Sequence, residues 1–476
     1  MEENTLVNLS YSEFPLLMNM ASTSSSLVFT VRRCEAELVA PAIPTPHQLK
    51  LLSDIDDQDG LRFHISVILF FRNHPSMAQK DPVEVLRKSL AQTLVFYYPL
   101  AGRLWEGPHR KLMVDCNGEG VLFIEADADV TLDHFSDNLQ PPFPCFQQLL
   151  YDVPGSQQIT NTPLLLVQVT RLKCGGFILG VRFSHTMFDA AGLSQFLNAW
   201  AEMARGGATK PSIAPVWRRE LLLARDPLRI TCKHREYEQV QGSITPSYDN
   251  LVNRSFFVGP GEIAHLRCLV PPHLQHCTSF DLITACLWRC RTKALQIVAE
   301  DDVRMMCVVN ARSRFNPPLP VGYYGNAFAY PAAVTTAGKL CGNPFGYAVE
   351  LINKVKREVT EEYMHSVADL MVSKERCLFT TVRSFIVSDL TRAKFTEVDF
   401  GWGDAVYGGP LQGGAGPFPA TTYFTPVKNA KGEQGLIFPI WLPAQAMERF
   451  ANEFNDMFQN QNLPLTGAPP FIISTL

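Results

Sequence analysis

The chain has 476 residues, of which 46% are hydrophobic and 18% are charged, and its formal net charge is -4. Because this length exceeds the roughly 250–300 residues at which a single hydrophobic core stops growing, we expect two domains. The slightly acidic balance and the lack of a long basic stripe exclude nucleic acid as a partner, and no apolar run reaches the roughly 18 residues that a membrane span requires.

Cysteine usage and the two ends of the chain bear on the cellular compartment. The twelve cysteines are scattered without a CxxC pair, so we expect free thiols in a reducing compartment and no metal site. Residues 1–20 have acidic residues near their start and no basic region, which predicts a flexible N-terminal extension and a cytoplasmic protein. The final residues Ser474, Thr475 and Leu476 weakly resemble a peroxisomal address, so the peroxisome is the alternative.

The first half alternates strand-like and helix-like segments. A helix over 81–98 begins with Asp81 as N-cap and Pro82 in its first turn, and a second helix over 190–207 is stopped by glycines. Alternating or continuous apolar runs predict strands at 27–34, 64–72, 111–115, 121–125 and 164–172. The polar, proline-containing stretch 209–250 then predicts a crossover linker.

The second half repeats the same alternation. It predicts strands at 253–259, 304–311, 378–388, 420–426 and 435–441, and helices over 260–270, 278–295 and 346–372. Strands and helices that alternate in both halves favour two α/β sandwich domains of similar size.

The stretch FILGVRFSHTMFDAAGLSQF, 177–196, places His185 at the end of an apolar strand. An imidazole with an ordinary pKa near 6.5 can act as a general base, and a strand end fixes its position. The alternative is a histidine whose hydrogen bonds are satisfied in the core. Asp189 could orient the imidazole or cap the following helix, and the sequence leaves both roles open. The usual motifs of serine hydrolases, nucleotide hydrolases, dinucleotide-binding enzymes and zinc proteases are absent.

Two further stretches and a basic cluster are unusual. DFGWGDAVYGGP, 399–410, contains glycines around Trp402, which is typical of a tight turn with an anchoring aromatic residue. VNARSRFNPPLPVGYYGNAF, 309–328, follows a strand and could line a cleft between domains. Lys354, Lys356 and Arg357 form either a solvated helix face or a local anchor for a phosphate.

Five sequence blocks carry a resemblance that spans almost the whole chain after about residue 27. They are LSDID at 52–56, YYPLAGR at 97–103, HTMFD at 185–189, RSRFNPPLPVGYYGN at 312–326 and DFGWG at 399–403. In this order they resemble the BAHD family of acyl-CoA-dependent acyltransferases, whose motifs include HxxxD and DFGWG. Most family members continue HxxxD with glycine, whereas this chain has Ala190, which still permits a helix to begin.

The resemblance implies two chloramphenicol-acetyltransferase-like α/β sandwich domains joined by a long crossover, with a solvent channel between them. The first domain would comprise 21–208 plus about 397–423, and the second 251–396 plus about 424–476. The resemblance also implies a monomer that binds only an acyl-CoA and an alcohol, with no metal or tightly bound cofactor.

The family's roles carry over to matching positions. The resemblance implies that His185 is the general base, and that Asp189 forms a structural ion pair with Arg312. It implies that Asp399, Gly401, Trp402 and Gly403 are structural. Ser388 is our guess for a group that stabilises the oxyanion. The implied CoA contacts are Thr278, Ser279, Phe280 and Asn326.

Within the family, the blocks are most similar to alcohol acyltransferases, and we expect benzoyl-CoA as donor and benzyl alcohol as acceptor. An acetyl-CoA-dependent enzyme acting on aliphatic alcohols is the alternative within the same class. A non-catalytic binding protein and a thioesterase on the same scaffold are alternatives from other classes.

Overall fold

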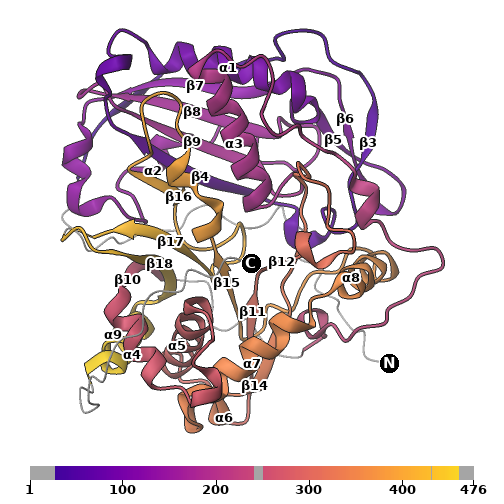
Figure 1. Cartoon of the computed structure of the whole chain (residues 1–476), viewed down its shortest axis with the longest axis vertical. Helices are drawn as coiled ribbons and strands as arrows, with labels where there is room; N and C mark the ends of the chain where they lie inside the picture. Colours follow the sequence, from indigo (N-terminus) through magenta and orange to yellow (C-terminus); the bar gives the residue numbers. More distant parts are fainter. Residues whose placement is uncertain (1–26, 241–249, 430, 460–476) are drawn as a thin grey trace.

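The structure is a computed structural model, and it describes residues 27–240, 250–429 and 431–459. Figure 1 shows two layered α/β units, one built from the first part of the chain and one from the later part. Both centre on a large mixed sheet, which confirms the predicted α/β class with two domains. The described residues leave out 1–20, most of 241–250 at the end of the crossover, and the last three residues. The expectations for these parts stay predictions.

The first unit contains a seven-stranded sheet in the order β1-β7-β8-β9-β4-β16, with β2 paired to β7. Helices α1 and α3 pack on one face of this sheet, and α2 on the other. The elements are β1 (Val31–Arg33), β2 (Glu37–Val39), β4 (His64–Phe71), α1 (Pro82–Phe96), β7 (Val121–Ala128), α2 (Phe146–Leu149), β8 (Leu165–Leu172), β9 (Phe177–Ser184), α3 (Ala190–Arg205) and β16 (Tyr407–Pro410).

Helix α1 shows how the sequence builds this unit. The carboxylate of Asp81 accepts a hydrogen bond from the Val83 amide at 3.1 Å, and Pro82 occupies the first turn, where a missing N–H costs nothing. Leu86, Leu90 and Leu94 recur every four residues and are fully buried on one helix face. The predicted helix is therefore confirmed, and it ends at Phe96.

The second unit contains a six-stranded sheet in the order β10-β18-β17-β15-β11-β14. Most of its helices pack on one side of the sheet, as Figure 1 shows for α4, α5, α7 and α9. The elements are β10 (Leu251–Val258), α4 (Pro260–Cys268), α5 (Ser279–Ala294), β11 (Asp302–Cys307), β14 (Ala332–Thr336), α6 (Ala337–Gly342), α7 (Phe345–Glu358), α8 (Glu361–Ser373), β15 (Ser384–Asp389), β17 (Thr421–Lys428), β18 (Gln434–Pro443) and α9 (Ala444–Gln459).

Two small sheets complete the fold. One contains β3 (Leu49–Leu51), β5 (Arg103–Glu106) and β6 (Leu112–Asp115), and the other pairs β12 (Val309–Asn310) with β13 (Phe328–Ala329). The crossover passes through short 3-10 turns at Arg219–Leu222 and Arg235–Tyr237. These turns bring crossover side chains into the protein interior, where Arg219 is 1% exposed.

The expectation of one helix over 346–372 was wrong, because the chain breaks at Val359 and Thr360 into α7 and α8. The Thr360 side chain accepts a hydrogen bond from the Tyr363 amide at 3.2 Å and thereby caps the second helix. Helix α9 and strand β16 were not predicted from the sequence. β16 reads Tyr-Gly-Gly-Pro, which has the composition of a turn, yet it pairs antiparallel with β4.

The pairing of β16 with β4 returns a segment of the later chain to the first sheet. In Figure 1, β16 lies beside β4 at the lower edge of the upper unit, next to β17 of the second sheet. The domain boundaries near 208, 250, 397 and 423 stay predictions.

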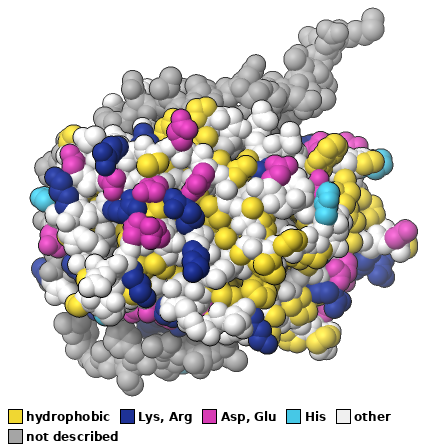
Figure 2. All heavy atoms as spheres, turned by 90° about the horizontal axis from the view of Figure 1, so that it is seen from above, with side chains coloured by type: hydrophobic (Ala, Val, Ile, Leu, Met, Phe, Trp, Pro, Cys, Tyr) yellow, Lys and Arg dark blue, Asp and Glu magenta, His cyan; other side chains and the backbone are white. Residues whose placement is uncertain are grey.

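The surface shows no large region of one charge sign on the face seen in Figure 2, where basic and acidic side chains are interleaved. Strand and helix residues of the first unit form such mixed pairs, for example Arg171 with Asp81 and Glu125. Over the described residues, no helix is long and apolar enough to cross a membrane.

Candidate active site

His185 lies immediately after β9, at the end of the first sheet. Its backbone N–H donates to the carbonyl of Phe63 at 2.9 Å, which continues the antiparallel pairing of β9 with β4 by one residue. The backbone at the imidazole is therefore held by sheet hydrogen bonding, as the position at a strand end predicts.

Aromatic rings surround the imidazole of His185. The ring centroids of Phe63, Phe183 and Phe328 lie 5.3, 6.3 and 6.0 Å from that of His185. Part of the His185 side chain remains accessible, whereas its Nδ1 is buried and has no hydrogen-bond partner among the described residues. A substrate would therefore have to approach the imidazole from the side away from Nδ1.

Burial lowers the pKa of His185 below its ordinary value of 6.5, and the negative charges of Asp189 and Asp56 only partly oppose this effect. A low-dielectric environment disfavours the imidazolium, so the neutral form persists at neutral pH. A neutral imidazole with an open Nε2 can accept a proton from a hydroxyl group.

Asp189 is held by Arg312 and does not form a triad with His185. The guanidinium donates to both carboxylate oxygens, at 2.7 and 2.9 Å. The same carboxylate accepts from the amides of Gly192 at 2.9 Å and Ala327 at 3.1 Å. Asp189 is thus both an ion-pair partner and the N-cap of α3, which begins at Ala190.

The four donors around Asp189 also explain its ionisation. Burial acts to raise the pKa of this carboxyl, but Arg312 and the two amides outweigh burial and lower it. Asp189 is therefore a carboxylate at neutral pH and acts as an acceptor only. Its hydrogen bonds hold the backbone that follows His185.

Asn326 lies behind His185 and is fully buried. Its side-chain amide donates to the backbone carbonyl of His185 and to the carboxylate of Asp56, each at 2.8 Å. Asn326 is thus enclosed in the protein interior. The contact between Asn326 and CoA, which the family resemblance implies, stays a prediction.

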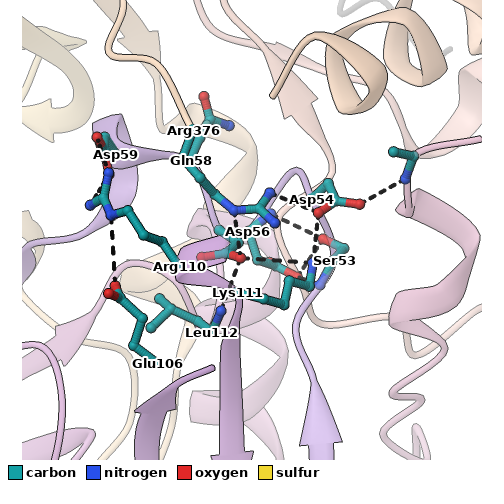
Figure 3. A network of polar contacts seen from close by, with 12 residues as sticks. Ser53, Asp54, Asp56, Gln58, Asp59, Glu106, Arg110, Lys111, Leu112 and Arg376 are labelled. Atoms are coloured by element: carbon teal, nitrogen blue, oxygen red, sulfur yellow. Dashed lines mark hydrogen bonds and ion pairs between the residues drawn. The ribbon is translucent and has the colours of Figure 1, made fainter. Parts of the chain in front are cut away.

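Asp56 belongs to a buried acidic loop that the sequence analysis noted only as a resemblance. Figure 3 shows Asp54, Asp56 and Ser53 gathered at one place, with Lys111 and Arg376 pointing toward them. Asp54 lies 2.7 Å from the nitrogens of both Lys111 and Arg376. The available signal was three aspartates interleaved with apolar residues in the LLSDIDDQ segment, because buried carboxylates need partners.

The DFGWG stretch forms a tight turn of the first unit. One carboxylate oxygen of Asp399 accepts from the amides of Gly401 at 2.7 Å and Gly403 at 2.8 Å, and both glycines have positive φ. Trp402 packs edge-on against Phe177, with ring centroids 5.2 Å apart. These contacts are those of a packed turn, as the resemblance implies.

The remaining candidates lie in the second unit. Ser388 is in β15, half-buried and opposite Tyr423 of β17. Thr278 caps α5 by accepting from the Asp281 amide at 3.3 Å. Among the described residues no group of three or more His, Cys, Asp or Glu could hold a metal ion.

Lys356 brings the basic cluster next to the start of α5. Its ammonium lies 2.6 Å from the Asp281 carboxylate and 5.0 Å from the centre of the Phe280 ring. Lys354 and Arg357 on the same helix are exposed. Thr278, Ser279 and Phe280 therefore lie beside positive charge.

Comparison with known proteins decides the family. A family model described as the Transferase family matches residues 29–457. This chain is a BAHD acyltransferase. The benzyl alcohol O-benzoyltransferase of Petunia hybrida is 62% identical over 440 residues, which cover 92% of this chain and 95% of the Petunia protein.

Solved structures show the same fold for this BAHD acyltransferase. Vinorine synthase superposes with a TM-score of 0.67 at 24% identity, covering 90% of this chain and 98% of that one. F. graminearum TRI101, solved in complex with coenzyme A and deoxynivalenol, has a TM-score of 0.65 at 14% identity, covering 86% and 98%. The chain is therefore an enzyme that transfers acyl groups.

Proposed function

We propose that this enzyme transfers a benzoyl group from benzoyl-CoA to benzyl alcohol, with His185 as general base. The observation that carries the chemistry is a partly accessible imidazole at the end of β9, which lies among aromatic rings and has no hydrogen-bond partner at Nδ1. The name of the Petunia hybrida relative supports these two substrates.

The reaction proceeds in a ternary complex. Nε2 of His185 accepts the hydroxyl proton of the alcohol as its oxygen attacks the thioester carbonyl. The resulting oxyanion collapses, the C–S bond breaks, and the proton on the imidazolium passes to the departing CoA thiolate. Holding both substrates beside one base makes the attack effectively unimolecular. We assign to Ser388 a role in stabilising the oxyanion.

The surroundings of His185 favour planar substrates. Phe63 stacks edge-on against Phe418, whose ring lies 4.6 Å from that of Phe379, so the rings beside the imidazole continue from one unit into the other. Aromatic pairs with offset or edge-on geometry gain about 0.5–1.5 kcal/mol beyond their buried area. A benzoyl or benzyl ring entering this cluster would keep such contacts, whereas a short aliphatic chain would lose them.

For the CoA side we propose Thr278, Ser279 and Phe280 at the start of α5, with the neighbouring basic cluster as anchor for phosphate groups. The ammonium of Lys356 lies over the ring of Phe280, and the exposed Lys354 and Arg357 add positive charge. The binding of coenzyme A by TRI101 supports a CoA thioester as donor.

The first experiment measures CoA release by the purified protein with benzoyl-CoA and benzyl alcohol, with the ester identified by mass spectrometry. Benzyl benzoate is the expected product, and the expected kcat/KM is at least about tenfold higher than with acetyl-CoA and 1-butanol. A higher kcat/KM with the acetyl and butyl pair would contradict the aromatic specificity. Benzoate released without an alcohol would instead indicate a thioesterase, and no turnover with either pair would indicate a binding protein.

The pH dependence follows from the lowered pKa of His185. The imidazole must be neutral to accept a proton, and its pKa lies below 6.5, so the active form persists below the pH at which an ordinary histidine protonates. We expect kcat/KM to be level from about pH 6.5 to 8 and to fall only at lower pH, with a slope of about tenfold per pH unit. An acid limb with its midpoint above 6.5 would contradict a buried neutral base.

A further inference from the structure

The backbone that carries His185 is held from behind by two side chains. The carbonyl of His185 accepts a hydrogen bond from Nδ2 of Asn326 at 2.8 Å, and the carbonyl of Met187 accepts one from Nη2 of Arg219 at 2.7 Å. Asn326 is fully buried and Arg219 is 1% exposed. Both contacts therefore lie in an interior from which water is excluded, where hydrogen bonds are electrostatically strong.

One carboxylate organises both of these side chains. Oδ1 of Asp56 accepts from the backbone amide of Asn326 at 2.9 Å and from its Nδ2 at 2.8 Å. Both oxygens of Asp56 accept from Nη1 of Arg219, at 2.9 and 3.0 Å. Asp56 itself is fully buried, and Ser53 donates to it from its backbone amide at 3.1 Å.

The three residues come from three parts of the chain. Asp56 lies in the loop before β4, Arg219 in the crossover, and Asn326 before β13 in the second unit. The His185 backbone belongs to the first sheet, so the Asp56 cluster fixes it to the crossover and to the second unit. If the two substrates meet between the units, the position of the imidazole relative to both depends on this cluster.

We propose that Asp56 is a positioning residue for acyl transfer, which acts through Asn326 and Arg219 to hold the backbone of His185 and Met187. This inference rests on the proposed role of His185 as the general base. Proton transfer requires the imidazole within about 3 Å of the hydroxyl oxygen, so a small displacement of its backbone lowers the rate without removing a substrate contact.

The alternative is a purely cohesive role, in which Asp56 only stabilises the fold. Asp54 in the same loop allows the two roles to be compared. Asp54 is two residues away and 4% exposed, but it pairs with Lys111 and Arg376 and accepts from the Ala224 amide at 2.7 Å. Its partners hold other segments, whereas those of Asp56 hold the two carbonyls beside the base. If buried ion pairs here only stabilised the fold, removing either carboxylate would have the same consequence.

The test compares Asn326→Leu with Asp54→Asn, each purified and assayed well below its melting temperature. Leu has the same branched shape as Asn and the same number of side-chain heavy atoms but no donor, so the variant loses the bond to His185 and leaves the pair of Asp56 with Arg219 in place. We expect kcat to fall about 10²-fold in Asn326→Leu, with KM for acyl-CoA unchanged within about threefold. In Asp54→Asn we expect a lower melting temperature with kcat within about threefold of wild type.

A pH profile gives a second readout, because the charge of Asp56 also acts on the imidazole. The charged groups near His185 are Asp56 and Asp189, each paired with an arginine, and His64 of β4 lies in register with the preceding residue, Ser184. Asp56→Asn removes a negative charge that favours the imidazolium and exposes the base to unpaired Arg219. The acid limb of kcat/KM should therefore move to lower pH in this variant.

Several outcomes would overturn the inference. A kcat of Asn326→Leu within about threefold of wild type, or equal losses in Asn326→Leu and Asp54→Asn, would each leave only a cohesive role. An unchanged acid limb in Asp56→Asn would show that Asp56 does not act on the base, and if that variant does not fold, Asn326→Leu decides. Should wild type show no turnover with any acyl-CoA and alcohol, the proposed function fails separately. The His185 pKa, measured by NMR of labelled histidine in wild type and Asp56→Asn, then tests the inference without activity.

Discussion

His185→Gln is expected to lower kcat by about 10²–10⁴-fold, because general-base assistance contributes about this much to a rate. Glutamine approximates the size of the imidazole and can donate a hydrogen bond, but it does not accept a proton at neutral pH. KM for acyl-CoA should change little, since the imidazole acts on the alcohol proton in the transition state. Steady-state kinetics with benzoyl-CoA and benzyl alcohol measure both quantities.

A second histidine provides the matched control for this variant. His234 is 8% exposed, and its Nε2 lies 2.8 Å from Oγ of Ser366, so it holds the crossover against α8. His234→Gln should lower the melting temperature and leave kcat of the folded enzyme near that of wild type. If His185→Gln kept more than about a tenth of the wild-type kcat, the general-base role would be wrong. The imidazole would then contribute less than about tenfold to the rate, which is less than a general base provides.

Arg312→Met is expected to lower the free energy of unfolding by about 3–5 kcal/mol, because it leaves the buried carboxylate of Asp189 without its charged partner. The side chain of Asp189 is 10% exposed, so water cannot replace the guanidinium. Methionine keeps much of the side-chain length, which separates loss of charge from loss of packing. Chemical denaturation followed by fluorescence measures the change.

The double variant Asp189→Asn with Arg312→Met tests the cause. With the carboxylate also removed no charge is left buried, so the double variant should be more stable than Arg312→Met alone. Equal or additive losses would mean that the effect comes from packing. A loss in Arg312→Met of less than about 1 kcal/mol, as for a solvent-exposed pair, would show that this ion pair contributes little.

Local patterns in the sequence were enough to predict most of the regular elements. Strand β9 and helix α3 lie where apolar periodicity placed them, and the boundary between them is the capped turn at Asp189. The break between α7 and α8 was missed because both helices carry helical periodicity and Thr360 interrupts it only through its capping bond. Strand β16 was missed because its partner β4 is more than 330 residues away in sequence, as the pairing of Tyr407 with Phe70 shows.

Some residues of the candidate site could likewise be found from local sequence, and others could not. His185 could be found from one strand end, whereas the roles of Asp189 and Arg312 needed either the family resemblance or the fold. Asn326 was assigned to the CoA side from the family resemblance alone, because the sequence does not show which groups its side chain contacts. In the structure the same residue faces the backbone of His185.

The sequence by itself determined most of the elements, the α/β class and the candidate for the base, because each depends on interactions between residues that are near one another along the chain. Only the tertiary structure decided which carboxylate forms an ion pair with which arginine. Asp54 and Asp56 are two residues apart in one acidic loop, yet one faces Lys111 and Arg376 and the other faces Arg219 and Asn326. A buried charge must find its partner wherever the fold brings one within hydrogen-bonding distance, and that proximity is not encoded in any local pattern.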